Sequence, residues 1–303
     1  VFKLQDQVAN VVVESLKLQL VGGSRIADLP GGTANADAYN LYLRGYQINY
    51  ANAPAEAAAL LRQAVALDPN FGSAWAELAW VYWTSVGSDT SEKALGAATS
   101  EDAVRTLKEL LKAASLHPSS TYYQLSAALL AYQRKADDAI LLAERAIALD
   151  PSDFWAYEQV ARSMAYGGRA SDAKIYLEAA WRVDPRPNSS RYLLAGLVAF
   201  SLDRFDDAID ALGKADARDF NEFNNVQRLF LLAATYGHLG NAAEAAKVKT
   251  ELESISNANG LRAIGDLPFQ KPADVERLLT GLNKAGVPDL PFGYRWDAPE
   301  RLD

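Results

Sequence analysis

Small residues recur through most of this chain at a nearly constant interval. The aligned positions are Ala57, Thr106, Ala139, Ala173, Ala208 and Ala245. Successive members are 49, 33, 34, 35 and 37 residues apart. Four of these five intervals lie close to the period of about 34 residues that is typical of stacked helix–turn–helix units. The recurrence therefore predicts an all-α array in which each unit contacts only its neighbours.

A second small residue follows the first by seven positions in five of the six units. These residues are Ala64, Ala113, Ala146, Ala180 and Ala215, with Leu252 in the last unit. Because seven residues make about two helical turns, both small side chains lie on one face, where a neighbouring helix can pack closely. Three units end in nearly the same phrase, Leu67-Asp68-Pro69, Leu149-Asp150-Pro151 and Val183-Asp184-Pro185. Proline cannot continue a helix, so each phrase predicts a helix end.

One unit shows the expected pattern clearly. Its first helix is predicted from Phe154 to Tyr166, and Gly167-Gly168-Arg169 interrupt it. Its second helix is predicted from Ser171 to Val183. Two helices joined by a tight turn are thus the building block of the chain.

Other units carry a named resemblance. Trp75, Leu78, Ala79 and Tyr82 are similar to the first-helix signature of tetratricopeptide repeats, and Leu232, Ala233 and Tyr236 match it again. The resemblance implies an all-α, right-handed superhelix of about six helix pairs over residues 38–256. An insert is expected near 85–102, and an insertion in the second repeat also resembles arrays attached to bacterial class III adenylate and guanylate cyclases.

The two ends lie outside the repeats. Residues 1–21 predict an amphipathic helix, and 22–37 a linker rich in glycine. The helix either caps the first repeat or is the end of a preceding domain. Its Phe2-Lys3-Leu4-Gln5-Asp6-Gln7 resembles the closing helix of the TolB amino-terminal-like domain, which precedes such arrays in bacterial regulators. Residues 257–303 are expected to cap the last repeat, with a short helix from Asp274 to Lys284, and they resemble the tail of cyclase-linked proteins.

Composition restricts the function. The net charge is −8, which argues against a surface for nucleic acid, because such surfaces are basic. The chain has no cysteine, and its two histidines, His117 and His238, lie in different repeats, so we expect no metal, no cofactor and no catalytic residues. No run of about 18 apolar residues predicts a membrane span. Since the chain starts at Val1 and its only methionine is Met164, we expect a fragment or a processed product.

Acidic residues stand directly before the small residue of five second helices. They are Glu56, Asp138, Asp172, Asp207 and Glu244. Negative charge in the first turn of a helix offsets the exposed N–H dipoles. We prefer this structural interpretation to a catalytic one because it explains all five positions at once.

The first helices carry the functional hypothesis, because in tetratricopeptide arrays they line the concave surface. The positions mapped onto that groove are Tyr39, Tyr42, Tyr46, Asn49, Tyr50, Trp80, Trp83, Leu125, Tyr132, Trp155, Glu158, Arg162 and Tyr166. Aromatic residues and arginine dominate the energetics of protein interfaces. The groove therefore predicts capture of a partner, and the alternative is that these side chains fill a narrow interior.

Together these features predict a non-catalytic interaction scaffold. Its partner would be a protein or peptide segment, or a neighbouring domain of the same polypeptide. By resemblance it is a regulatory part of a bacterial signalling protein such as a class III adenylate or guanylate cyclase. The alternatives are a sensor region of a membrane-anchored transcriptional regulator and, less favoured, an enzyme. A cytoplasmic location is preferred, with the periplasm as the alternative.

Overall fold

The structure is a computed structural model that describes residues 29–50, 53–85, 93–186, 189–216, 218, 222–255 and 267–287. These residues form thirteen α-helices and no strand, so the all-α class is confirmed for them. The predicted helix at 1–21, most of the linker, and residues 257–266 and 288–303 lie outside the described residues.

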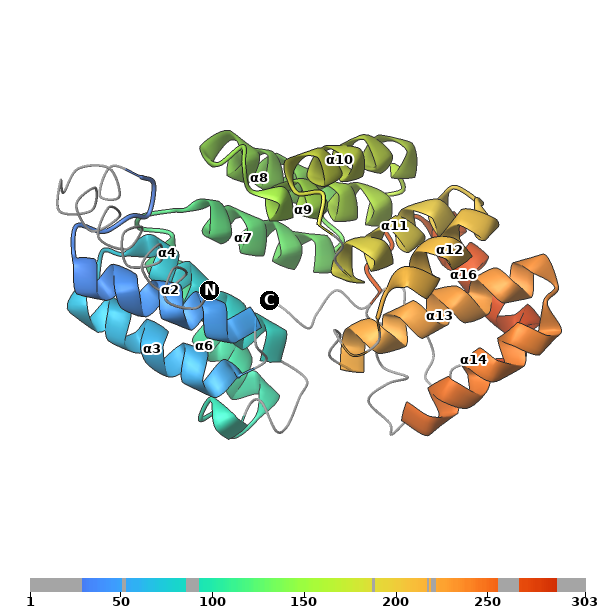
Figure 1. The fold of residues 1–303 in the computed structure, drawn as a ribbon, viewed down its shortest axis with the longest axis horizontal. Coiled ribbons are helices and arrows are strands. Elements are labelled where there is room, and N and C mark those ends of the chain that lie inside the picture. The colour runs from blue at the N-terminus through green and yellow to red at the C-terminus, as the bar shows by residue number, and fades with distance from the viewer. Residues whose placement is uncertain are drawn as a thin grey trace, which may run out of the picture. The chain divides into compact units, whose positions relative to one another are not determined.

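The helices follow one another in pairs (Figure 1). The pairs are α2 (Ala36–Tyr50) with α3 (Pro54–Leu67), α4 (Gly72–Ser85) with α6 (Ser100–Ala114), α7 (Ser120–Tyr132) with α8 (Ala136–Leu149), α9 (Phe154–Tyr166) with α10 (Ala170–Val183), α11 (Ser189–Ser201) with α12 (Phe205–Lys214), and α13 (Glu222–Leu239) with α14 (Ala242–Ile255). A last helix, α16 (Pro272–Lys284), follows. The prediction of about six pairs and a closing helix is confirmed.

The chain divides into two compact units, Val1–Leu125 and Ser126–Asp303, called unit 1 and unit 2 below. The division falls inside α7. In both units the core is built from the small residues of the repeat and the aliphatic side chains around them. Ala57 and Ala64 in unit 1, and Ala173 and Ala180 in unit 2, are fully buried. The predicted packing role of these residues is therefore confirmed.

Small residues in the first helices bring the two helices of a pair together. A Cβ atom on Gly45 would lie 2.8 Å from Cγ of Leu61, and one on Gly196 would lie 2.4 Å from Cγ of Leu212. In each case the leucine belongs to the second helix of the same pair. A larger side chain at either glycine would push its helix away from its partner.

The turns within the pairs share one backbone conformation. Seven residues after the small residue of the first helix, four turns have a residue with positive φ: Arg134 (59°), Gly168 (73°), Asp203 (57°) and Gly240 (68°). The N–H of the next residue then donates to a carbonyl in the last turn of the first helix, as from Arg169 to Met164 at 2.8 Å. This left-handed closure satisfies a carbonyl that the helix end would otherwise leave unpaired.

The recurring Asp-Pro phrases end the second helices by a shared geometry. Asp68, Asp150 and Asp184 are extended, and each N–H donates at 3.0 Å to the carbonyl of the preceding buried alanine. Each carboxylate accepts the N–H two residues further on, at 3.0–3.1 Å. The proline carbonyl is also used in two phrases, because Pro69 accepts from the indole of Trp75 at 2.8 Å and Pro151 from the hydroxyl of Tyr157 at 3.2 Å.

The fifth pair departs from the predicted register. Ala215 was expected on the second helix, but α12 ends at Lys214 and is 10 residues long, against 14 for α10. Asp216 accepts the N–H of Arg218 at 2.9 Å, as Asp184 accepts the N–H of Arg186 in the fourth pair. The closing turn of the fifth pair therefore comes about one helical turn earlier than that of the fourth pair. Ala215 remains buried, although it lies just past the helix.

The insert does not lengthen the first helix of the second pair, because α4 has 14 residues and ends at Ser85. Within its described part, Leu95 and Ala97 are buried in unit 1. The carbonyl of Leu95 accepts hydrogen bonds from Tyr82 at 3.2 Å and from Arg62 at 3.1 Å. Thr99 then caps α6 by accepting the N–H of Asp102 at 3.1 Å. Residues 95–99 are therefore a loop held against α3 and α4.

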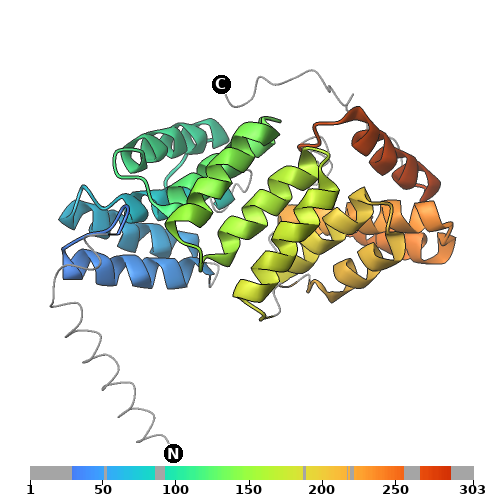
Figure 2. The ribbon, with the colours of Figure 1, turned by 90° about the horizontal axis from the view of Figure 1, so that it is seen from above.

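The closing helix packs on the last pair (Figure 2). Two glycines make the contact, because a Cβ atom on Gly237 of α13 would lie 1.9 Å from the carbonyl oxygen of Gly281 of α16. Val275, Leu278 and Leu282 complete it from α16 and are buried. The helix starts at Pro272, two residues before the predicted start at Asp274.

Candidate functional site

One position of the first helices shows how the predicted groove changes along the chain. It is the residue directly after the small residue: Tyr46, Trp80, Ala128, Arg162, Leu197 and Ala234. In unit 1, Tyr46 is 36% exposed and Trp80 is half-buried. In the last two pairs of unit 2, Leu197 is 1% exposed and Ala234 is fully buried. The same helix face is thus aromatic and accessible in unit 1 and apolar and closed at the end of unit 2.

The tyrosines of α2 form a continuous row. The ring centroids of Tyr39 and Tyr42 lie 6.1 Å apart, and those of Tyr42 and Tyr46 lie 6.2 Å apart. Tyr42 also contacts the buried ring of Phe71 at 5.1 Å, which fixes the row against the start of α4. These tilted arrangements fall within the range that aromatic pairs prefer. The side chain of Tyr50, the last predicted member, lies outside the described residues.

Two tryptophans and an amide continue this surface. Trp80 and Trp83 on α4 are half-buried, and Asn49 on α2 donates to the carboxylate of Glu77 on α4 at 3.1 Å. That bond links the two first helices of unit 1. Six predicted residues with described side chains thus belong to α2 and α4. We call this set the tyrosine–tryptophan face: Tyr39, Tyr42, Tyr46, Asn49, Trp80 and Trp83.

Glu158, another predicted groove residue, is buried in unit 2 at 1% exposure and does not line an open surface. Its carboxylate accepts from Nε of Arg191 at 2.6 Å, and the guanidinium lies 4.7 Å from the ring centroids of Phe154 and Trp181. Burial raises the pKa of Glu158, and the facing Arg191 opposes that rise. The pair joins α9 to α11, so its role in this structure is internal. Leu125, also mapped onto the groove, is likewise fully buried.

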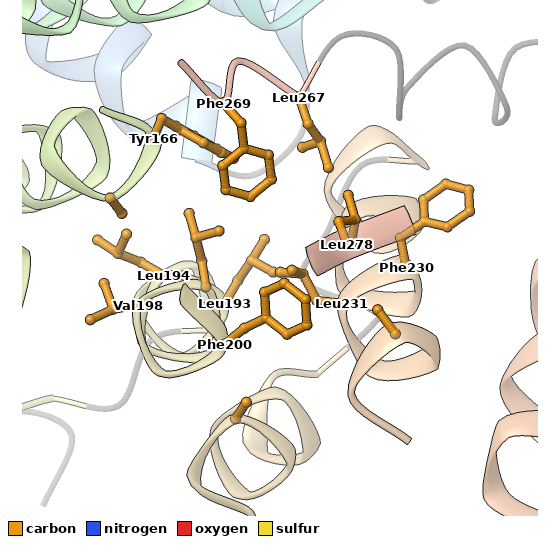
Figure 3. Close-up of a cluster of buried hydrophobic side chains, with 14 of the residues drawn as sticks. Tyr166, Leu193, Leu194, Val198, Phe200, Phe230, Leu231, Leu267, Phe269 and Leu278 are labelled. Atoms are coloured by element: carbon orange, nitrogen blue, oxygen red, sulfur yellow. The ribbon is translucent and has the colours of Figure 1, made fainter. Parts of the chain in front are cut away.

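Tyr166 is the third predicted groove residue that the structure buries, at 1% exposure. Gln227 on α13 donates to its hydroxyl, and burial raises the pKa of Tyr166 to about 12. The ring of Phe269 meets it edge-on, with centroids 5.3 Å apart (Figure 3). Sequence reasoning assigned no site role to Phe269. For Tyr166, the alternative of internal filling fits better than an open groove.

The remaining predicted residues, Tyr132, Trp155 and Arg162, are half-buried in unit 2. The ring of Trp155 packs against Phe154 at 5.0 Å, next to the Glu158–Arg191 pair. These three residues therefore remain partly accessible but do not belong to the tyrosine–tryptophan face.

The polar residues considered for chemistry have local structural contacts. The acidic residues before the small positions lie in the first turns of their helices, and three of them pair locally: Asp172 with Arg169 at 3.1 Å, Asp207 with Arg204 at 2.6 Å, and Glu244 with Lys247 at 2.5 Å. This agrees with the preferred helix-dipole interpretation. His238 stacks on Phe205 at 4.6 Å and bonds the carbonyl of Arg277 at 2.8 Å, and His117 is exposed. Among the described residues no group of three or more potential metal ligands comes together.

Comparisons with known proteins support the fold. No protein-family model matches the chain, and no curated protein matches it. Among solved structures it is similar to PilW, a type IV pilus biogenesis factor, with 15% identity, a TM-score of 0.51, and coverage of 76% of this chain and 99% of that one.

Two further solved structures match less well. PilF of Pseudomonas aeruginosa has 16% identity and a TM-score of 0.47 over 75% of this chain and 96% of that one. A tetratricopeptide repeat protein from Parabacteroides merdae has 13% identity and a TM-score of 0.44 over 86% and 95%. The repeat pattern, the six helix pairs and the likeness to PilW agree at the level of fold. The fold is a tetratricopeptide-type array. None of the described helices in this array has the length and apolar composition that a membrane span requires.

Proposed function

We propose that this array is a non-catalytic interaction scaffold and that its tyrosine–tryptophan face binds a segment of another protein or of a neighbouring domain. One observation carries the proposal. Leu197 and Ala234 close one position of the helix face in unit 2. In unit 1 the same position carries Tyr46, which is 36% exposed, and Trp80, which is half-buried.

The chemistry of the face suits a protein partner. Tyrosine and tryptophan offer a large apolar body together with a hydrogen-bonding tip, and they are enriched among the residues that contribute most to binding. The ring centroids of the α2 row lie 6.1 and 6.2 Å apart. A helix or an extended strand places successive side chains on one side at comparable spacing, so either could lay an apolar edge along the row.

The wider biological role rests on resemblance. The ends of the chain resemble the parts that flank arrays in bacterial class III adenylate and guanylate cyclases, so we propose a regulatory role in such a signalling protein. A sensor region of a membrane-anchored transcriptional regulator is the alternative. The open reading frame around this chain distinguishes them, because a cyclase domain supports the first and a DNA-binding domain supports the second.

The binding proposal is tested by substitution on the face. The variant Tyr46→Ala with Trp80→Ala should retain the helical circular dichroism of the wild type and lose at least about 90% of the partner captured when the chain is used as bait, because two large interface side chains are removed. Ile175→Ala is the matched control, since Ile175 is an exposed apolar residue of α10 in unit 2. Equal capture by wild type and double variant would contradict the proposal, and turnover of a nucleotide by the purified chain would contradict its non-catalytic part.

A further inference from the structure

A short extended segment after the repeats contacts the ends of two first helices. The segment is Leu267–Lys271, which precedes α16, and we call it the strap. The backbone N–H of Gln270 donates to the carbonyl of Tyr166 at 2.8 Å, and its side-chain amide donates to the carbonyl of Arg134 at 2.9 Å. The ammonium of Lys271 donates to the carbonyl of Gly168 at 2.7 Å. The strap thus contacts two successive pairs with consecutive residues.

The acceptors occupy equivalent places in the repeats. Arg134 and Gly168 are the positive-φ residues of the turns after α7 and α9, and Asp203 has the same place after α11. Asp203 also takes part, because its carboxylate accepts from Nε of Arg277 at 2.7 Å. The C-terminal end of a helix carries unpaired carbonyls and a partial negative charge. Three such ends in a row make an edge that favours a donor-rich, basic segment.

An apolar anchor fixes the register of the strap. Leu267 and Phe269 are each 1% exposed, whereas Gln270 and Lys271 are exposed. Phe269 lies against Tyr166, and Leu267 lies near the residues of α13 and α16 that form the same cluster (Figure 3). The strap is therefore divided along its length: the consecutive buried residues Leu267, Pro268 and Phe269 hold the segment, and the exposed Gln270 and Lys271 pair with the turns.

The polar contact between the strap and the turns lies at the surface of unit 2. A hollow of about 460 Å³ lies beside it, lined by Gly168 and Arg169 of the turn, Ser201 of α11, and Lys271 and Arg277 from the tail side. The polar contacts of Gln270 and Lys271 are at the surface, where hydrogen bonds to water can replace them at low net cost. The strap is therefore held mainly by its buried apolar residues, among which Phe269 contacts Tyr166.

We propose that the edge formed by these turns and Tyr166 is a peptide-binding site, that the strap is its resident ligand, and that a segment of another chain with the same chemistry replaces the strap. That chemistry is an extended apolar residue, a proline and an aromatic residue, followed by an amide and a basic side chain. The site lies in unit 2 and does not depend on the tyrosine–tryptophan face, so either proposal can fail alone.

The test uses the full chain and a fluorescent peptide with the sequence of residues 267–272, Leu-Pro-Phe-Gln-Lys-Pro. Phe269→Ala frees the anchor site, and the variant should bind the peptide at least about tenfold more tightly than the wild type, whose own strap competes. Peptides with alanine in place of phenylalanine or glutamate in place of lysine should bind the variant at least about tenfold more weakly. Equal binding of the original peptide by variant and wild type would overturn the proposal.

A second variant is needed because Phe269 is part of a core cluster, so Phe269→Ala could also change the fold. Gln270→Ala changes an exposed side chain and removes only the bond to Arg134. It should keep the helical circular dichroism of the wild type and bind the peptide with an affinity at least about threefold higher than that of the wild type. Binding should weaken with added salt because the ammonium of Lys271 donates to a carbonyl beside the partially negative end of α9. A folded Gln270→Ala protein that binds no better than the wild type would also overturn the proposal.

Discussion

Unit 1 and unit 2 are built from the same kind of helix pair, but they carry different residues on the face of the first helix. In unit 1 the face carries Tyr39, Tyr42, Tyr46, Trp80 and Trp83, with rings exposed in part. In the last pairs of unit 2 the corresponding face carries Leu197 and Ala234, buried in the cluster that includes α16 and the strap. The small residue of each first helix sets how the pair packs, and the residue beside it sets whether the face binds something further. A repeat can therefore keep its scaffold while its surface changes.

The largest effect is expected at the buried ion pair of unit 2. Arg191→Ala leaves the Glu158 carboxylate buried without its guanidinium, and it should lower the free energy of unfolding by about 3–5 kcal/mol in urea titrations. Glu158→Leu with Arg191→Met should recover most of that loss. In unit 1, Asn49→Ala removes one bond to Glu77 and should cost about 1 kcal/mol. Equal losses of stability from Arg191→Ala and Asn49→Ala would contradict the idea that the buried ion pair contributes more to unit 2 than the bond between Asn49 and Glu77 contributes to unit 1.

A second prediction concerns the glycine contact that seats α16. Gly237→Ala places a methyl group where the carbonyl of Gly281 lies and should cost about 2–3 kcal/mol by the same titration. Gly213→Ala is the control, because its Cβ would meet nothing within 4 Å on the exposed side of α12, and it should gain up to about 1 kcal/mol. A neutral Gly237→Ala would show that α16 does not pack at this crossing.

A third prediction compares a buried with an accessible tyrosine. Tyr166→Phe leaves the amide of Gln227 without its acceptor and should cost about 1–2 kcal/mol, whereas Tyr39→Phe should change stability by less than about 0.5 kcal/mol. Burial raises the pKa of Tyr166 from 10.0 to about 12. The unfolded chain therefore loses this proton first, so stability falls as the pH rises above 10. Thermal melts between pH 9 and 12 should show a smaller fall for Tyr166→Phe than for the wild type.

The smallest effect on stability is expected at the tyrosine–tryptophan face. Tyr46→Ala with Trp80→Ala should change the free energy of unfolding by less than about 1 kcal/mol, because both rings are accessible in part. A loss as large as that of Arg191→Ala would mean that these rings are core, and the contrast between the two units would fail.

Much of the fold could be predicted because its determinants are local. The spacing of Ala139 and Ala173, the Asp-Pro phrases and the break at Gly167-Gly168 each act through neighbouring residues. The shortened α12 was not predicted, because Ala215 kept the expected spacing while Asp216 formed the closing turn early. The local pattern does not show whether the repeat spacing, which would extend the helix past Ala215, or the turn at Asp216 decides where the helix ends.

The site was less predictable for a different reason. Mapping positions onto the groove placed Tyr42 and Tyr166 alike, since both lie on first helices. Contacts distant in sequence distinguish them, because Gln227 bonds the hydroxyl of Tyr166, and Phe269 and Gln270 reach Tyr166 from more than a hundred residues further along the chain. The one cue in the sequence was Leu-Pro-Phe, a short apolar phrase outside the repeats.

Two bare backbones meet where α13 crosses α16, at Gly237 and Gly281. A tail displaced by one residue would bring Thr280 or Leu282 to that point, and either side chain would hold the helices apart. The crossing therefore favours one register of α16 on α13, and in that register Leu278 and Leu282 are buried in the same cluster as Phe230 and Leu231. A chain with α16 in another register would leave apolar surface exposed, and exposed apolar surface is the feature that chaperones and proteases recognise.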